Sequence, residues 1–187
     1  MERLHSLQIR PATESDFAAV SELAGISARQ TSQGVYTPSQ IAGLAELAVI
    51  DKTLIADGTY FVIEVGGIIR ASGGWSRWPS LTHYDNPGPS NGAPLDPATD
   101  SARIRHLYTH PEFGGRGLGR ALLATAEAAA RLAGFHSGEM IATPAGQRLY
   151  ASAGWRPSGG VELQTRNGAI LAAVRMKKSF RPRERAA

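Results

Sequence analysis

The sequence contains no cysteine among its 187 residues. Disulfide frameworks, thiol nucleophiles and cysteine-ligated zinc sites are therefore excluded. It also lacks any apolar run close to the roughly 20 residues that a membrane-spanning helix needs. The first six residues have no apolar core of the kind found in signal peptides. These absences lead us to expect a soluble cytoplasmic protein with no membrane partner.

A strong excess of one charge is missing as well. The 20 lysines and arginines stand against 16 acidic residues, which gives a net charge of +4, and 42% of the residues are hydrophobic. A chain of this length and apolar content can bury its own core. The basic residues are scattered except near the C-terminus, so a nucleic-acid partner is not expected. We expect one domain over residues 1–180 and a basic tail over residues 181–187.

Glycine, by contrast, is concentrated in one loop. A strand-like run ends at His110, the loop spans residues 114–120, and an Ala/Leu-rich segment typical of a helix follows at once. Unpaired backbone N–H groups and the positive end of the helix dipole meet at such a helix start, where Arg116 and Arg120 add charge. The loop therefore predicts a site for a phosphate or pyrophosphate group.

The spacing within this loop separates three kinds of phosphate site. A nucleoside-triphosphate loop ends in Gly-Lys-Ser/Thr, whereas this one ends in Gly119-Arg120-Ala121. A Rossmann fingerprint needs G-x-G-x-x-G in a first βαβ unit, whereas the spacing here is G-x-G-x-G past the middle of the chain. Glu139, about 20 residues further on, gives the Rossmann interpretation only weak support.

The loop instead resembles the acetyl-CoA loop of the GNAT N-acetyltransferases, whose pattern is Arg/Gln-x-x-Gly-x-Gly/Ala. Gly117 and Gly119 fall on the two small positions, and Gly114 stands where the family usually has Arg or Gln. Residues 143–155 resemble a later family motif, N-x-x-A-x-x-L-Y-x-x-x-G-F. They match it at Leu149-Tyr150 and Gly154, with Gly146 in place of the alanine, Thr143 in place of the asparagine and Trp155 as the final aromatic residue.

This resemblance implies an α/β GNAT fold, in which a central mixed sheet is flanked by helices. It implies an acetyl-CoA-dependent N-acetyltransferase that needs no metal and transfers acetyl directly to a primary amine of a small molecule or a protein. Homodimers, common in the family, are implied in the same way. By resemblance, acetyl-CoA contacts the strand at Leu107, Tyr108 and Thr109 and the loop at Gly114, Gly115, Arg116, Gly117, Leu118, Gly119 and Arg120.

Tyr150 is the candidate general acid, because the resemblance places it facing the thioester sulfur. A phenol with a pKa of about 10 is protonated at neutral pH and can donate to a departing thiolate. A core tyrosine with a bonded hydroxyl is the alternative. Candidates for the base are Glu64 and His106, followed by His110 and Glu139.

Strand alternation would place His106, Tyr108 and His110 on one face and Arg105, Leu107 and Thr109 on the other. Tyr36, Trp75 and Arg77 are candidate walls of the acceptor pocket, although Trp75 could equally be core and Arg77 solvated. If Arg77 or Arg105 points into the cleft, an acceptor with an acidic group is favoured.

The hydrophobic and turn patterns predict the element order β-α-α-β-β-β-α-β-α-β-β. The strands are expected at residues 7–10, 58–65, 68–76, 102–109, 138–142, 161–165 and 169–176, and the helices at 13–28, 37–50, 117–133 and 145–153. Residues 79–100 are expected to form a loop that serves as a lid or an interface. The long helix should bury the stripe Leu118, Leu122, Ala126, Ala129 and Leu132.

Two other functions compete with catalysis on a free amine. One is a GNAT-like domain that binds acyl-CoA as a sensor without turnover. The other is acetylation of an amine carried on a nucleic acid, which would need a basic platform near the cleft. Retention of Tyr150 and of the open glycine loop favours the enzyme.

Overall fold

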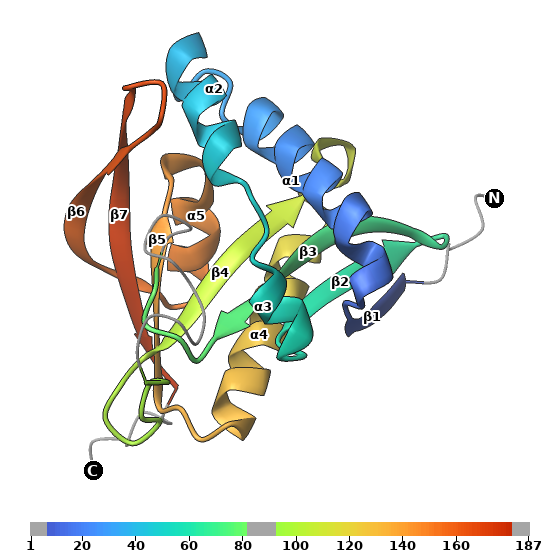
Figure 1. Ribbon diagram of the computed structural model, residues 1–187, viewed down its shortest axis with the longest axis vertical. Helices are drawn as coiled ribbons and strands as arrows, with labels where there is room; N and C mark the ends of the chain where they lie inside the picture. Colours follow the sequence, from blue (N-terminus) through green and yellow to red (C-terminus); the bar gives the residue numbers. More distant parts are fainter. Residues whose placement is uncertain (1–6, 82–92, 181–187) are drawn as a thin grey trace.

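The computed structural model describes residues 7–81 and 93–180, which form a single seven-stranded sheet with helices on both faces (Figure 1). Part of the predicted 79–100 loop and the predicted basic tail lie outside the described residues. The strands are β1 (Leu7–Pro11), β2 (Tyr60–Val65), β3 (Ile68–Ser76), β4 (Ala102–Thr109), β5 (Ser137–Ala142), β6 (Arg156–Gln164) and β7 (Ile170–Ser179). The α-helices are α1 (Phe17–Thr31), α2 (Pro38–Leu47), α3 (Lys52–Ala56), α4 (Leu118–Leu132) and α5 (Pro144–Ser152), and short 3₁₀ turns are η1 (Glu14–Asp16) and η4 (Pro111–Phe113).

The sheet is mixed, with the strand order β1-β2-β3-β4-β5-β7-β6. Every neighbouring pair is antiparallel except β4 and β5, which run parallel and are joined through α4. The predicted α/β architecture with a central mixed sheet is thus confirmed. All seven predicted strands are present.

The helix starts follow the capping signals in the sequence. Thr13 and Asp16 form a capping box ahead of α1, and Thr37 and Gln40 form a second one ahead of α2. The predicted second helix is too long, because α2 ends at Leu47 and a separate helix α3 follows. Asp51 begins α3 by accepting a hydrogen bond from the N–H of Thr53 at 2.9 Å.

Two apolar layers cover the two faces of the sheet. α1 and α3 pack on one face with the inward residues of β2, and α4 packs on the other. The buried stripe of α4 is Leu118, Leu122, Leu123, Ala126 and Ala130. Leu132 was predicted to belong to it but is 90% exposed, because each helical residue turns the chain by about 100° and carries this position away from the stripe.

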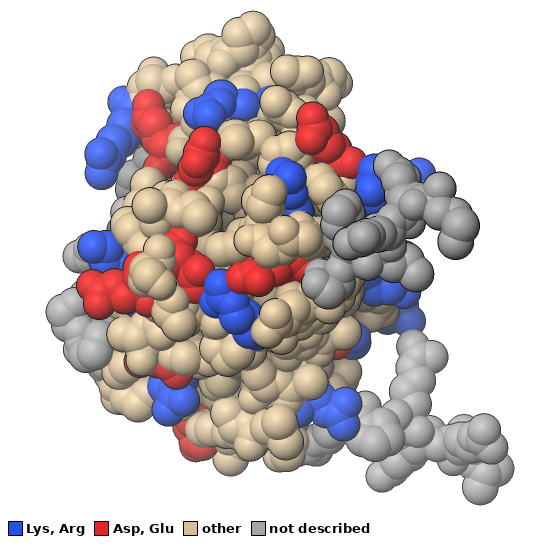
Figure 2. Space-filling model, turned by 90° about the vertical axis from the view of Figure 1, so that its right-hand side faces the viewer, with Lys and Arg blue, Asp and Glu red and all other residues tan. Residues whose placement is uncertain are grey.

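Charges of both signs are interspersed on the face of the molecule that Figure 2 displays. Arg10 forms ion pairs with both Asp16 and Glu64. Within residues 7–81 and 93–180, no helix is long and apolar enough to cross a membrane. The same residues contain no group of three or more His, Asp or Glu side chains placed to hold a metal ion.

Close packing between strands makes one glycine of β3 sensitive to substitution. A Cβ at Gly74 would overlap the carbonyl oxygen of Thr59 and lie 2.9 Å from the Cα of Tyr60, both main-chain atoms that cannot move aside. We predict that Gly74→Ala lowers the free energy of unfolding by about 3 kcal/mol. Gly160→Ala is the control, because a Cβ at Gly160 meets nothing within 4 Å. Thermal unfolding of both variants checks this, and equal stabilities would contradict it.

Candidate active site

A pocket of about 280 Å³ opens where β4 and β5 separate. The two parallel strands pair only at Ala102–Gly138 and Arg103–Glu139, and beyond these pairs they diverge (Figure 1). Along one side the pocket is lined by Gly119, Met140, Ile141, Thr143, Ala145, Gly146, Leu149, Tyr150 and Leu163, and along the other by Ser27, Ala28, Thr31, Ser32, Leu44, Leu47 and Leu81. Residues 104–109 of β4 lie between the two sides.

A β-bulge interrupts β4 inside the pocket. Arg105 pairs with Gly74 and Tyr108 with Ser72, so His106 and Leu107 together stand opposite the single residue Gly73. His106 has a φ of +57°, the only positive value among the described non-glycine residues. The extra residue ends regular side-chain alternation at this point of the strand.

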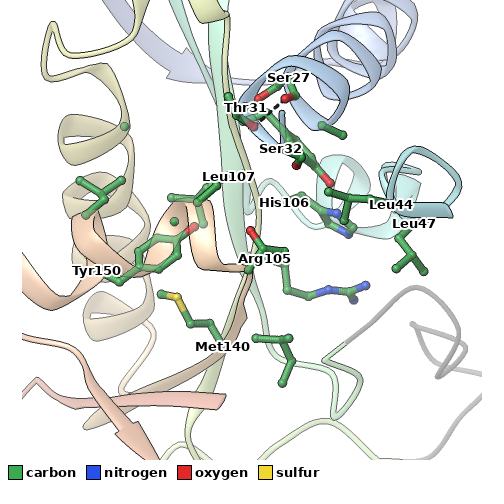
Figure 3. Close-up of a pocket in the computed structure, with 18 of the residues that line it drawn as sticks. Ser27, Thr31, Ser32, Leu44, Leu47, Arg105, His106, Leu107, Met140 and Tyr150 are labelled. Atoms are coloured by element: carbon green, nitrogen blue, oxygen red, sulfur yellow. Dashed lines mark hydrogen bonds between the residues drawn. The ribbon is translucent and has the colours of Figure 1, made fainter. Parts of the chain in front are cut away.

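The bulge corrects the predicted distribution of β4 side chains. Arg105 reaches Asp51 at the start of α3, whereas Leu107 packs with the α4 layer on the opposite face. Figure 3 shows Leu107 on the side of Tyr150, and Arg105 and His106 on the side of Leu44 and Leu47. Arg105 and Leu107 therefore do not share a face of the sheet. The prediction that they do was wrong, because it assumed regular alternation along an unbroken strand.

The glycine loop lies at the N-terminus of α4. Gly115 and Gly117 have φ values of +72° and +85°, and a Cβ at either would meet nothing within 4 Å. The first helical hydrogen bond runs from the N–H of Ala121 to the carbonyl of Gly117. Among the described residues, the N–H groups from Gly115 to Arg120 have no main-chain acceptor. The loop is therefore an open cradle of donors, which suits an anionic group.

The other predicted loop residues serve the shape of this cradle. The N–H of Gly114 donates to the carbonyl of Pro111 at 3.0 Å, so it is used inside the turn. Arg120 donates to the hydroxyl of Ser152 at 2.9 Å, which links α4 to α5. The guanidinium of Arg116 lies 4.9 Å from the centre of the Phe113 ring. Both arginines add positive charge around the cradle.

Tyr150 lies across the gap from the bulge. Its ring packs on Gly146, where a Cβ would lie 2.6 Å from the ring atom Cε2, and this contact accounts for a glycine at that position. Figure 3 shows Tyr150 reaching from α5 toward Leu107. Burial raises the pKa of the Tyr150 hydroxyl to about 12, which keeps it protonated at neutral pH.

Of the four candidate bases, only His106 lines the pocket. The carboxylate of Glu64 is bound by Arg10 at the edge of the sheet. His110 packs edge-on against Phe113 with ring centres 6.0 Å apart.

Glu139 serves the sheet rather than the pocket. Glu139 is 5% exposed, and its carboxylate accepts from Arg103 at 2.7 Å and Arg175 at 2.9 Å, with Lys177 at 3.9 Å. It thus ties β4, β5 and β7 together.

The predicted acceptor walls lie outside the pocket. Tyr36 donates to the carbonyl of Ala172 at 2.6 Å. Trp75 is a core residue, 3% exposed and stacked edge-on against Phe135 at 5.6 Å. Arg77 is exposed beside the Trp75 ring. Side-chain alternation could not separate core from wall here, because residues 71–76 at the end of β3 are all buried.

The side of the pocket toward α1 is lined by residues that the sequence did not single out, apart from Arg105. Ser27, Thr31 and Ser32 come from the end of α1, and Arg105 faces them from β4. Besides Arg105, which the sequence already offered as a possible cleft residue, the sequence signal for this region is Asp51, a residue type typical of helix starts, which contacts Arg105 at 3.3 Å.

Comparison with known proteins gives the family context. No curated protein matches the sequence. Solved structures with the same fold include the GCN5-related N-acetyltransferase from Rhodopseudomonas palustris, with 21% identity over 96% of this chain and 100% of that chain and a TM-score of 0.71. The structure of yncA from Salmonella typhimurium with its cofactor acetyl-CoA has 22% identity over 97% of both chains and a TM-score of 0.65. The PaiA N-acetyltransferase from Thermoplasma acidophilum in complex with coenzyme A has 16% identity over 94% of this chain and 99% of that chain and a TM-score of 0.62.

The match to a family model is the decisive comparison. Residues 56–157, more than half of the chain, match the acetyltransferase (GNAT) domain. This segment includes the diverging strands, the glycine loop and Tyr150. The chain therefore belongs to the GNAT acetyltransferase family.

Proposed function

We propose that this protein is an acetyl-CoA-dependent N-acetyltransferase that transfers the acetyl group directly to a primary amine. The observation that carries the proposal is the divergence of β4 from β5 after two residue pairs. It leaves a slot with the open N-terminus of α4 at one end and Tyr150 across it. Two of the structural neighbours were solved with acetyl-CoA or coenzyme A, which supports the same ligand here.

The two ends of the slot suit different parts of acetyl-CoA. The N–H groups from Gly115 to Arg120 would hold the pyrophosphate, and the space above Gly115 and Gly117 is open for it. The pantetheine would lie along Leu107, Tyr108 and Thr109, whose main-chain groups face the region that β5 has left. Because the main chain supplies these contacts, binding depends little on the side chains of β4.

Acetyl transfer then needs a neutral amine and a proton for the leaving thiolate. The amine loses its proton to His106 or to water, and its nitrogen attacks the thioester carbon. An N–H group of the bulge polarises the carbonyl oxygen during the attack. When the C–S bond breaks, Tyr150 gives its proton to the sulfur and regains one from solvent.

We assign the side of the pocket toward α1 to the acceptor amine and call it the acceptor side. Its lining favours a particular class of amine. Arg105 is its one permanently charged residue, and no carboxylate lines the pocket among the described residues. The ion pair with Asp51 offsets part of the Arg105 charge, so an acidic group on the acceptor would be attracted moderately and a second positive group repelled to a similar degree. Small amines that carry a carboxylate or phosphate therefore fit better than polyamines.

A sensor that binds acyl-CoA without turnover is the second candidate. It would use the same loop and slot but would not need a proton donor beside the sulfur. The placement of Tyr150, with its pKa raised by burial, favours the enzyme. Tight acetyl-CoA binding without coenzyme A release on any amine would favour the sensor.

The glycine loop can be tested first. We predict that Gly117→Val weakens acetyl-CoA binding about 100-fold or more, because a branched side chain would occupy the space of the phosphate and resist the φ of +85°. Gly168→Val is the matched control, since Gly168 has a φ of +80° in the turn between β6 and β7. Titration calorimetry with acetyl-CoA measures both, and unchanged affinity in the Gly117 variant would remove the loop assignment.

The role of Tyr150 has a kinetic signature. We expect Tyr150→Phe to lower kcat by about 10²-fold and leave acetyl-CoA affinity within about twofold, because the ring remains and only the proton donor is lost. With the pKa raised to about 12, the wild-type kcat should show no loss from Tyr150 ionisation between about pH 7 and pH 10. Full activity of the Phe variant would rule out Tyr150 as the acid.

The acceptor class can be tested with a panel of matched amines. We predict that amino acids and amino phosphates release coenzyme A with kcat/KM at least about tenfold above that of polyamines of similar size. The double variant Arg105→Met/Asp51→Asn removes the ion pair without leaving a buried charge, keeps a capping residue ahead of α3, and should reduce this preference. A panel led by polyamines would contradict the assignment of the acceptor side.

A further inference from the structure

The backbone of the bulge is held in a conformation that its own residue disfavours. A left-handed φ costs a non-glycine residue roughly 1 kcal/mol or more. His106 adopts φ +57° in the middle of the pocket, where it and Leu107 together stand opposite Gly73 of β3. Such an outlier persists only when its surroundings hold it in place.

One contact that holds the bulge comes from a buried tyrosine on β2. The hydroxyl of Tyr60 lies 3.2 Å from the carbonyl oxygen of His106 and 3.0 Å from the Oγ of Ser72. Because a carbonyl oxygen can only accept, the single phenolic proton is donated to His106, and the hydroxyl of Ser72 donates to the oxygen of Tyr60. Tyr60 and Ser72 are both fully buried, at 0% exposure. Burial raises the pKa of Tyr60, so its hydroxyl keeps the proton that it donates.

This hydrogen bond fixes the direction of one peptide group. A carbonyl tied to Tyr60 cannot rotate, so the peptide between His106 and Leu107 is held in one orientation. The N–H of that peptide belongs to Leu107, and Leu107 lines the pocket on the side of Tyr150. The hydroxyl therefore acts on the slot through the backbone and without touching its contents.

We propose that Tyr60 is a positioning residue for acetyl transfer: its hydroxyl locks the His106 carbonyl, and the locked bulge aims its main-chain N–H at the thioester carbonyl of acetyl-CoA. This inference rests on the proposed function. The same bond explains why a polar tyrosine occupies a core position of β2 that is otherwise packed among Val20, Leu54 and Val62.

The test is the infrared stretch of the thioester carbonyl in bound acetyl-CoA, read as the difference between unlabelled and ¹³C-labelled ligand. Polarisation by an N–H should shift this band in the wild-type complex away from its position in free acetyl-CoA. In Tyr60→Phe we expect the band to return toward the free position, while acetyl-CoA affinity stays within about twofold because the glycine loop is untouched. With an accepted amine, kcat should fall about tenfold, less than the 10²–10³-fold that follows loss of a direct donor.

Two further variants separate positioning from stability. Thr59→Val removes a neighbouring buried hydroxyl, which donates to the carbonyl of Leu54 at 3.2 Å outside the pocket, and it should keep the wild-type band. His106→Gly accepts a positive φ without strain. A glycine at position 106 should therefore keep the bulge without the Tyr60 hydroxyl. In the double variant Tyr60→Phe/His106→Gly, the carbonyl band should lie closer to the band of His106→Gly alone than to the band of Tyr60→Phe.

The outcomes separate the two proposals. The positioning role would be overturned by any of three results. These are an unchanged band in Tyr60→Phe, a loss of the shift in Thr59→Val, and a double variant whose band does not recover. It would also be overturned if the wild-type protein binds acetyl-CoA but shows no shift of the carbonyl band. In that case the proposed function would still be tested by coenzyme A release with the amine panel. A wild-type protein that does not bind acetyl-CoA would overturn the proposed function and this inference with it.

Discussion

The early separation of β4 from β5 is the constraint on which the rest of the site depends. Two parallel strands that paired along their whole length would satisfy each other's main-chain groups and leave nothing to bind a ligand. Here the pairing ends at Arg103–Glu139, and the following residues of β4 must find other partners. The proposed pantetheine contacts, the bulge and the approach of Tyr150 all lie in the gap that results.

The elements on either side of this gap have complementary chemistry. On the α4 side the chain offers bare N–H donors at a helix start, followed by the phenol of Tyr150. On the α1 side it offers hydroxyl groups, leucine side chains and the guanidinium of Arg105. β4 separates the two and contributes to both, because its bulge sends Arg105 and Leu107 to opposite faces. A single irregular strand can thus contact both the proposed acetyl donor, acetyl-CoA, and the proposed acceptor amine.

Much of this architecture could be predicted from local signals. The strands, the capping boxes and the glycine loop depend on residues close together in the sequence. Their positions agree with the structure, except that β6 begins at Arg156, well before the predicted start at residue 161. The bulge could not be predicted, since no glycine or proline marks it and alternation assumes a regular strand. The short helix α3 was missed although Asp51 has a residue type typical of a helix start. The sequence could not place Glu64 or decide between core and wall for Trp75, because their partners, Arg10 and Phe135, are distant in sequence and only the fold brings them together.

The carboxylate of Glu139 has a consequence for the working conditions of the protein. It joins Arg103 of β4 to Arg175 of β7 at the point where β4 and β5 last pair, so it holds the three strands together where β4 and β5 begin to diverge. Salt weakens attraction between exposed charges over distances of about 10 Å, but it weakens contacts of a buried carboxylate far less. The gap between β4 and β5 should therefore keep its width as ionic strength changes. The attraction between an anionic ligand and the exposed arginines of the glycine loop should decline under the same conditions.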